Sequence, residues 1–275
     1  MPEVAVPDDA SPRSAPLRDA ATVVLVRDSD TGIEVFLQRR VQQMAFAGGM
    51  TVFPGGGVDQ RDSDGDLAWV GPPPQWWASV FATSVELARA LVCAAVRETF
   101  EECGVLLASR NGVFPDPATL RADRAALVGK SLSLAQFLRT HDLTLRADLL
   151  RPLAHWITPV NEKRRYDTRF FLAAVPAGQS PDGATSEADV ARWAGAQDAL
   201  DAWQAGRHFL LPPTWAQLTE VARHRQVAEL LAAERQIEAI EPSTSAGKGL
   251  RGLAFRDSDD YFAGLADASI PDIKI

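Results

Sequence analysis

Residues 97 to 105 read RETFEECGV, and an upstream stretch at residues 53 to 59 reads FPGGGVD. In the first stretch Glu98, Glu101 and Glu102 follow i, i+3 and i+4 spacing, which places side chains on one face of an α-helix. Carboxylates gathered on one face can converge on a hard cation, and without one they repel each other. A solvated acidic helix face is the common alternative, so the surrounding residues must decide between the two.

The same helix is predicted to pack against a core. An apolar stripe runs along it through Val92, Val96, Phe100 and Cys103. Gly104 stands where a left-handed C-cap is expected, and an apolar run follows at residues 105 to 107. Arg97 lies four residues before Glu101 and can hold that carboxylate in one orientation. These features favour a packed helix with a cation site over a solvated one.

The upstream glycines complete this pattern. Residues 51 to 53 are expected to form a short strand that runs into Pro54 and then Gly55, Gly56 and Gly57. Where side chains are missing, backbone amides can approach a phosphate or a metal-bound carboxylate. A glycine run alone is usually a loop, so the glycines carry weight only together with the acidic helix.

Together, the two stretches resemble the Nudix hydrolase box: a glycine, five residues, a glutamate, seven residues, then R-E-U-x-E-E-x-G-U, with U a bulky aliphatic residue. The second half matches at every position except Thr99, which replaces an aliphatic residue. The first half is split, because Arg97 follows Gly56 by 41 residues rather than 14, an insertion of about 27 residues. Arg89 stands eight residues before Arg97, where the box has its glutamate.

A split box is similar to that of one Nudix branch, which contains a mammalian peroxisomal coenzyme A diphosphohydrolase. Three further stretches resemble this branch in order: residues 35 to 59, HWITPV with RRYDTRFFLAAVP between residues 155 and 176, and LPPTW at residues 211 to 215. The resemblance covers roughly residues 20 to 225. It implies an α/β (α+β) fold, an α/β/α sandwich around a mixed sheet, with an insertion in the box and added helices.

The resemblance also implies a site. Its catalytic residues would be Arg97, Glu98, Glu101 and Glu102, with the three glutamates as ligands of Mg²⁺ or Mn²⁺, cations that suit an all-oxygen site. Candidates for a fourth ligand or a base are Asp59, Glu86 and Glu187, and the number of metals stays open. Candidate substrate-binding residues are Arg39, Arg40, Gly55, Gly56, Gly57, Arg164 and Arg165. The last two arginines belong either to a solvated hairpin connection or to a phosphate site.

The implied activity is hydrolysis of a nucleoside diphosphate linked to another moiety. The branch favours coenzyme A or acyl-coenzyme A, giving adenosine 3′,5′-bisphosphate and 4′-phosphopantetheine. ADP-ribose or NADH are the alternative substrates. A catalytically silent domain that binds a nucleotide as a sensor is the alternative of another class, although a domain that only binds has no reason to keep mutually repelling carboxylates.

Composition fits one enzyme-sized unit of 275 residues, 46% of them hydrophobic. A formal charge of −8 argues against a nucleic-acid partner. No stretch has the length of a membrane span, residues 1 to 19 lack a signal-peptide core, and the expected location is cytoplasmic. Cys93 and Cys103 are expected to be packing residues rather than a disulfide or zinc site. A homodimer is the expected state, with a small-molecule nucleotide as partner.

The chain is expected to divide into a flexible segment at 1–19, a Nudix domain at 20–240 and an irregular tail at 241–275. Strands are expected at 21–26, 33–38, 155–160 and 169–175, and helices at 117–140, 197–203 and 213–238, with a helical addition at about 115–140. The box insertion at about 60–82 is expected to be a loop with one helical turn. Its aromatic residues either pack this insertion or line a substrate pocket: Trp69, Trp76 and Trp77.

Overall fold

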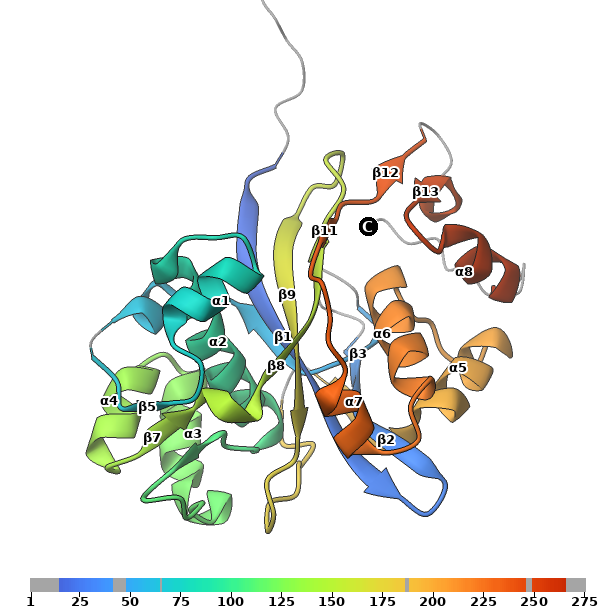
Figure 1. Cartoon of the computed structure of the whole chain (residues 1–275). Helices are drawn as coiled ribbons and strands as arrows, with labels where there is room; N and C mark the ends of the chain where they lie inside the picture. The colour runs from blue at the N-terminus through green and yellow to red at the C-terminus, as the bar shows by residue number, and fades with distance from the viewer. Residues whose placement is uncertain (1–14, 42–47, 65, 186–187, 246–248, 266–275) are drawn as a thin grey trace, which may run out of the picture.

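The computed structural model describes residues 15–41, 48–64, 66–185, 188–245 and 249–265. Within this part of the chain, a central sheet separates two groups of helices (Figure 1). One group comprises α1 (Pro74–Val80), α2 (Val85–Cys103), α3 (Arg121–Val128) and α4 (Leu134–Thr140). The other comprises α5 (Ala196–Gln204), α6 (Pro212–Ala222), α7 (Val227–Ala232) and α8 (Ser258–Gly264). The predicted α/β/α sandwich is thereby confirmed.

The main sheet of the described residues has eight strands in the order β10-β2-β1-β9-β8-β11, with β3 on β2 and β4 on β1. It is mixed, because β1 and β9 are parallel whereas β1 and β2 form an antiparallel hairpin. The long strands are β1 (Leu17–Ser29), β2 (Gly32–Arg40), β8 (Arg151–Ile157), β9 (Arg165–Ala174) and β10 (Ala188–Gly195). The short ones are β3 (Thr51–Val52), β4 (Gly55–Gly57) and β11 (Ala239–Ile240).

Strand β1 reads as a continuous apolar run because both of its faces are covered. Val23 and Leu25 are fully buried in the core beneath α1 and α2. Val24 and Val26 are fully buried in the core beneath α5 and α6. The parallel β1–β9 pairing at the centre of the sheet therefore separates two hydrophobic cores, and both contribute to the position of the site.

Helix α2 agrees with the sequence-based prediction in its packing and in its C-terminal cap. Its first turn is capped by the Ser84 hydroxyl, which accepts a hydrogen bond from the Leu87 amide, and it ends at Gly104 with a left-handed φ of 73°. The predicted stripe is buried along its whole length. Thr99, the departure from the box pattern, is buried and donates its hydroxyl to the Ala95 carbonyl at 2.7 Å, so the helix itself accommodates it.

The box insertion has more structure than predicted. It contains a 3₁₀ turn (Gln60–Ser63), strand β5 (Trp69–Val70) and α1, which begins directly after Pro73 with Pro74 in its first turn. Strands β5, β6 (Ala108–Ser109) and β7 (Thr144–Arg146) form a small separate sheet. Trp77 is fully buried, and Trp69 is partly buried against the same core. The packing interpretation of these two tryptophans is confirmed.

The helical addition packs directly on the box helix. A 3₁₀ turn (Pro117–Leu120) leads into α3, and residues 129 to 133 separate α3 from α4. Phe137 of α4 stacks on Phe100 of α2 with ring centroids 5.4 Å apart. The predicted helical segment at 117–140 is therefore present as two helices rather than one.

Two expectations at the C-terminal end were wrong. The helix predicted over 213–238 ends at Ala222 and restarts at Val227, where Asp28 accepts the Val227 amide and Glu229 accepts the Arg225 amide. The tail predicted to be irregular contains the hairpin of β12 (Ser243–Thr244) and β13 (Leu253–Ala254), a 3₁₀ turn (Gly249–Gly252) and α8. At the other end, β1 begins at Leu17, inside the segment expected to be flexible.

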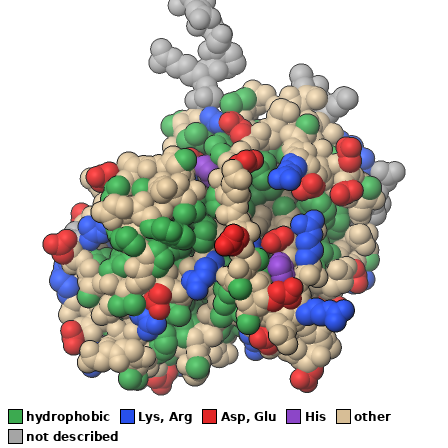
Figure 2. Space-filling model, viewed as in Figure 1, with side chains coloured by type: hydrophobic (Ala, Val, Ile, Leu, Met, Phe, Trp, Pro, Cys, Tyr) green, Lys and Arg blue, Asp and Glu red, His purple; other side chains and the backbone are tan. Residues whose placement is uncertain are grey.

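Hydrophobic side chains also reach the surface. Figure 2 shows them gathered beside the central strands, on the side of α1 and its neighbouring helices. Exposed apolar residues of the box insertion include Trp76 of α1 and Val70 of β5. In the described part of the chain no single helix has the length and hydrophobicity to cross a membrane, and α1 with α2, bent by 98°, passes only as a pair and only by length and composition. The homodimer stays a prediction.

Candidate functional site

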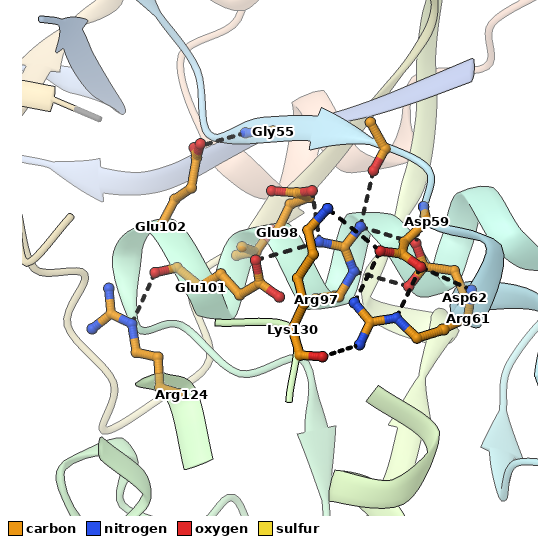
Figure 3. Close-up of polar contacts among 12 residues, drawn as sticks. Gly55, Asp59, Arg61, Asp62, Arg97, Glu98, Glu101, Glu102, Arg124 and Lys130 are labelled. Atoms are coloured by element: carbon orange, nitrogen blue, oxygen red, sulfur yellow. Dashed lines mark hydrogen bonds and ion pairs between the residues drawn. The ribbon is translucent and has the colours of Figure 1, made fainter. Parts of the chain in front are cut away.

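The three predicted glutamates lie in the last two turns of α2, where Glu98 and Glu102 lie against the glycine strand β4 and Glu101 lies beside Arg97 (Figure 3). Glu102 accepts a hydrogen bond from the Gly55 amide at 2.9 Å through Oε2. The Glu98 carboxylate lies directly against Gly56. Helix and glycines, 41 residues apart between Arg97 and Gly56, therefore meet despite the insertion.

Two of the three glycines are required by close approach. A Cβ atom on Gly55 would lie 2.5 Å from the Ala21 carbonyl oxygen, because β4 pairs with β1 at that point. On Gly56 it would lie 2.5 Å from Glu98 Oε1. On Gly57 the nearest atom is the Asp19 carbonyl oxygen at 3.9 Å, an ordinary contact. The missing side chain at Gly56 thus leaves the space that the Glu98 carboxylate occupies.

Arg97 is the centre of the polar network (Figure 3). Its Nη1 donates to Glu98 Oε1 at 2.7 Å and to Glu101 Oε2 at 3.4 Å. Its Nη2 donates to the Gly57 carbonyl at 2.9 Å, which ties α2 to β4. The predicted contact of Arg97 with Glu101 is therefore present, and the same guanidinium also binds Glu98.

Asp62 is the partner that the sequence analysis missed. It is buried and binds Arg97 in a bidentate pair, with Nε to Oδ1 and Nη2 to Oδ2 both at 2.9 Å. Counted forward from Gly56, Asp62 stands at the place of the upstream box glutamate, after five intervening residues. The sequence analysis placed Arg89 where the box has its glutamate, because the position was counted backward from Arg97 across the insertion. The insertion therefore follows this acidic residue and leaves the glycine half of the box intact.

Burial governs the charges in this network. It raises the pKa of the Glu98 carboxyl to about 7 and also raises the pKa of Glu101, with Arg97 opposing both shifts. Burial disfavours the charged form of Arg97 too, yet the Asp62 hydrogen bonds and the nearby carboxylates raise its pKa above the ordinary value. One arginine thus compensates three acidic groups, and negative charge remains in excess.

The acidic cluster fits a hard divalent cation by its chemistry. Glu101 Oε1 is buried and has no hydrogen-bond partner among the described residues. An oxygen in that state is costly unless a ligand satisfies it. In the same part of the chain, however, no three acidic, histidine or cysteine side chains already converge on one point. The residues that would hold a cation are Glu98, Glu101 and Glu102, of which Glu102 is now turned to Gly55.

A basic rim borders the network. Asp59, a predicted extra ligand, pairs with Arg61 at 2.9 Å and lies 3.7 Å from Lys130 Nζ. The hydrogen bonds from Arg61 hold the pKa of Asp59 well below its usual range. Lys130 has a left-handed backbone (φ 58°), and its carbonyl accepts a hydrogen bond from Arg61 at 2.7 Å. Its ammonium group is brought to the site by the turn after α3, and no sequence motif predicted this.

Arg124 of α3 fixes the end of the box helix. Its Nε donates to the Glu101 carbonyl at 3.0 Å, and its two terminal nitrogens bind Asp182 at 2.8 and 2.9 Å. On the other side, Gln38 Nε2 donates to the Glu102 carbonyl at 3.3 Å. The backbone of the two glutamates is therefore held from both neighbouring layers.

The remaining predicted residues divide between the site and other places. Arg40 and Glu86 line the same cavity as the glutamates. Arg39 is exposed and pairs with Asp189 of β10 at 2.8 Å. Arg165 is buried and pairs with Glu241 at 2.7 Å, and Arg164 is exposed in the β8–β9 connection. Among the described residues these three arginines are absent from the cavity wall, as are Trp69, Trp76 and Trp77. Glu187 lies outside the described residues.

The glutamates open into a cavity of about 1280 Å³. Its wall includes the three glycines, Arg97, Lys130 and all three glutamates, and it extends to segments far away in the sequence. Pockets for single small ligands measure roughly 300 to 1,000 Å³. This cavity has the volume for a larger ligand.

Comparison with known proteins identifies the arrangement. Residues 81–224 match a family model described as the NUDT19 Nudix domain. The chain is 30% identical over 211 residues to nudix hydrolase 7 of Caenorhabditis elegans, covering 75% of this chain and 61% of that protein. It is 28% identical over 291 residues to the acyl-coenzyme A diphosphatase NUDT19 of Gallus gallus, covering 84% and 75%.

A solved structure has the same fold. The Nudix hydrolase from Alicyclobacillus acidocaldarius superimposes with a TM-score of 0.67 at 28% identity, covering 81% of this chain and 98% of the other. The chain spans 61% of the length of the nematode relative.

Proposed function

This chain belongs to the NUDT19 Nudix domain family, and we propose that it hydrolyses the diphosphate linkage of coenzyme A or acyl-coenzyme A in a metal-dependent reaction. The products would be adenosine 3′,5′-bisphosphate and 4′-phosphopantetheine or its acyl derivative. The observation that carries the proposal is the set of three glutamates on α2, of which Glu98 and Glu102 contact glycine strand β4 and Glu98 and Glu101 bind Arg97. Relatives named acyl-coenzyme A diphosphatase support the choice of substrate.

The proposed roles follow from the contacts of each residue. Glu98, Glu101 and Glu102 would hold Mg²⁺ or Mn²⁺, and the unpartnered Glu101 Oε1 is the oxygen most in need of a ligand. The cation, when bound, supplies positive charge for the phosphoryl oxygens and lowers the pKa of a bound water. Arg97 keeps Glu98 and Glu101 in place, because its own orientation is fixed by Asp62. Strand β4 positions two of these carboxylates, because the Gly55 amide binds Glu102 and the missing side chain at Gly56 leaves room for Glu98.

The cavity wall suits a polyanion despite its acidic cluster. Arg18, Arg40 and Lys130 line it in addition to Arg97, which is already paired with acidic side chains. Side chains of this kind bind phosphate oxygens, and the protein's overall charge of −8 leaves that task to local cations. A nucleotide diphosphate could therefore be held between these groups and the metal site.

The test is product analysis on a panel of coenzyme A, octanoyl-coenzyme A, ADP-ribose, NADH and a diadenosine polyphosphate. Each compound is incubated with Mg²⁺, with Mn²⁺ or with chelator, and products are identified by mass spectrometry. We expect metal-dependent release of adenosine 3′,5′-bisphosphate from the coenzyme A compounds. Faster cleavage of ADP-ribose or NADH would replace the substrate, and nucleotide binding without turnover would favour a silent sensor.

The variant that tests the acidic cluster in this assay is Glu101→Gln. It removes one charge and one candidate ligand oxygen at constant volume, so we expect turnover to fall by about a thousandfold or more with the fold intact. Circular dichroism and thermal melting check the fold. Turnover equal to that of the unaltered protein would show that the acidic cluster is not the reaction site.

A further inference from the structure

The cavity has a second half with a different character. We call the part formed by α2, β4 and Lys130 the polar half. The remainder, here called the apolar half, is lined by hydrophobic side chains that include Phe53, Trp156, Phe170, Leu211, Pro242 and Leu253. Leu211 is half-buried and the other five side chains are buried, and all six come from widely separated parts of the sequence. A surface of this composition binds uncharged groups by removing them from water.

The two halves meet at the glycine strand. Phe53 belongs to the apolar half, and two residues later the Gly55 amide binds the Glu102 carboxylate. A ligand whose diphosphate lies at the glutamates would therefore have its attached group within reach of the apolar half. The volume of about 1280 Å³ also exceeds the roughly 1,000 Å³ at the upper end for single small ligands.

The C-terminal segment, by which we mean its described residues 239–245 and 249–265, forms one wall of the apolar half. Pro242 and Leu253 belong to the cavity lining, and the segment carries both. Strand β11 adds it to the edge of the main sheet beside Trp156 of β8. Phe255, which follows β13, packs edge-on against the same tryptophan with ring centroids 5.6 Å apart. The wall is thus built onto the central sheet.

Polar contacts hold this wall in one position. The buried Arg165 guanidinium binds Glu241 at 2.7 Å and the Thr158 carbonyl at 3.1 Å. Asn161 donates to the Thr244 hydroxyl at 2.8 Å. At the far end of the segment, the fully buried Tyr261 donates its hydroxyl to the Leu210 carbonyl at 2.8 Å and stacks on Trp203. A wall fixed at three points is preorganised for a ligand.

Resting on the proposed function, we propose that the apolar half binds an uncharged aliphatic tail attached to the diphosphate substrate, and that the C-terminal segment sets which tails are accepted. Buried methylene groups each contribute about 0.8 kcal/mol, equivalent to roughly a fourfold change in a binding constant. A tail of several methylenes would therefore raise kcat/KM steeply. The indole Nε1 of Trp156, buried and unpartnered among the described residues, is a donor that an amide or thioester carbonyl could satisfy.

The test measures kcat/KM for coenzyme A, acetyl-coenzyme A and octanoyl-coenzyme A. We expect octanoyl-coenzyme A to exceed acetyl-coenzyme A at least tenfold. Leu253→Trp, which places a larger side chain in the apolar half, should remove that preference. Leu253→Ala tests the same position in case Leu253→Trp does not fold. It should change the ratio of kcat/KM for octanoyl-coenzyme A to that for acetyl-coenzyme A.

The matched control is Leu250→Ala, which alters another buried leucine of the same segment that does not line the cavity among the described residues. It should leave the octanoyl-to-acetyl ratio unchanged. A second readout is direct binding of octanoyl-pantetheine, which carries the tail without the nucleotide. Equal rates across the three substrates, or equal effects of both leucine variants, would overturn the apolar half as a tail site. No hydrolysis of any substrate, with Leu253-dependent binding of octanoyl-pantetheine retained, would remove the proposed function and keep the tail site.

Discussion

The polar and the apolar half of the cavity are built in different ways. The polar half draws its key groups from two short stretches, residues 55–62 and 97–102, plus Lys130. The apolar half takes single side chains from the β3–β4 connection, β8, β9, the start of α6 and the C-terminal segment. The groups that meet within hydrogen-bonding distance are thus concentrated in two stretches of the sequence, whereas the hydrophobic wall is assembled from several elements of the fold.

The two halves also differ in how they respond to change. In the polar half, buried charges depend on one another, so removing a single partner leaves an uncompensated charge. In the apolar half, contributions follow buried area and volume, and hydrophobic replacements of similar size are tolerated. We therefore expect changes in the polar half to lower turnover of every substrate alike. Changes in the apolar half should alter only the dependence on the tail.

Among the changes that test the comparison of the two halves, the largest effect is expected from Gly56→Ala. The added methyl group would lie 2.5 Å from Glu98 Oε1, so the carboxylate must move by roughly 1 Å, a displacement that can cost about a hundredfold or more in rate. We expect kcat to fall by that factor for coenzyme A and for octanoyl-coenzyme A alike. Gly57→Ala is the control, because its methyl group meets only ordinary contacts. Its kcat should stay within about threefold of that of the unaltered protein. A tail-dependent loss in Gly56→Ala would contradict the division into two halves.

Asp62→Asn should have the next largest effect. The change removes the charge that pairs with buried Arg97, while Glu98, Glu101 and the Gly57 carbonyl remain as acceptors. Breaking a buried pair costs about 3 kcal/mol or more of unfolding free energy, which urea denaturation would measure. Turnover should fall by roughly tenfold to a hundredfold because Arg97 no longer orients the glutamates.

Asp62→Glu is the conservative partner of this variant. It keeps the charge and introduces the residue type that the Nudix box has at this position, so it should recover most of the stability and turnover. If Asp62→Asn were as stable and active as the unaltered protein, Arg97 would be held by its other acceptors alone. The polar half would then be less interdependent than its contacts indicate.

Asp62 also shows which features of the site could be predicted from the sequence and which could not. The box helix and its C-cap at Gly104 were predictable, because each depends on local spacing that an insertion does not alter. The pairing of this helix with the glycine run came from the resemblance to the Nudix box. The pairing of Asp62 with Arg97 depends on how a long insertion folds back, and backward counting from Arg97 concealed it. The contact between Glu102 and the Gly55 amide likewise needs the position of β4 beside β1.

The apolar half was not predictable for a related reason. Leu253 and Pro242 belong to a segment expected to be irregular, and no periodicity connects them to Trp156 or Phe53. Arg165 was a candidate phosphate ligand, since an arginine beside a polar hairpin is compatible with that role. Its burial against Glu241 follows from the C-terminal segment crossing the β8–β9 hairpin, which only the tertiary structure reveals.

A smaller effect is expected from Lys130→Gly. The left-handed backbone at this position favours glycine, so the unfolding free energy should be unchanged or raised by up to about 1 kcal/mol. Losing the ammonium group at the cavity wall should raise KM for every diphosphate substrate by about tenfold. Asn111→Gly relieves a similar backbone conformation away from the cavity and should leave KM unchanged. A loss of stability without a change in KM would make Lys130 a structural residue.

The smallest effect is expected at Arg39, and its neighbour Arg40 is the matched comparison. Successive residues of a strand point to opposite sides, so two adjacent arginines on β2 have different surroundings. Arg39 is exposed and paired with Asp189, whereas Arg40 lines the cavity. We expect Arg39→Ala to keep kcat/KM within about twofold, since exposed ion pairs contribute little. Arg40→Ala should raise KM for coenzyme A by roughly severalfold, because it removes a charge-assisted contact to a phosphate group in the cavity. Steady-state kinetics with both variants decides the matter, because a larger effect at Arg39 than at Arg40 would mean that the substrate extends over β10 rather than into the cavity.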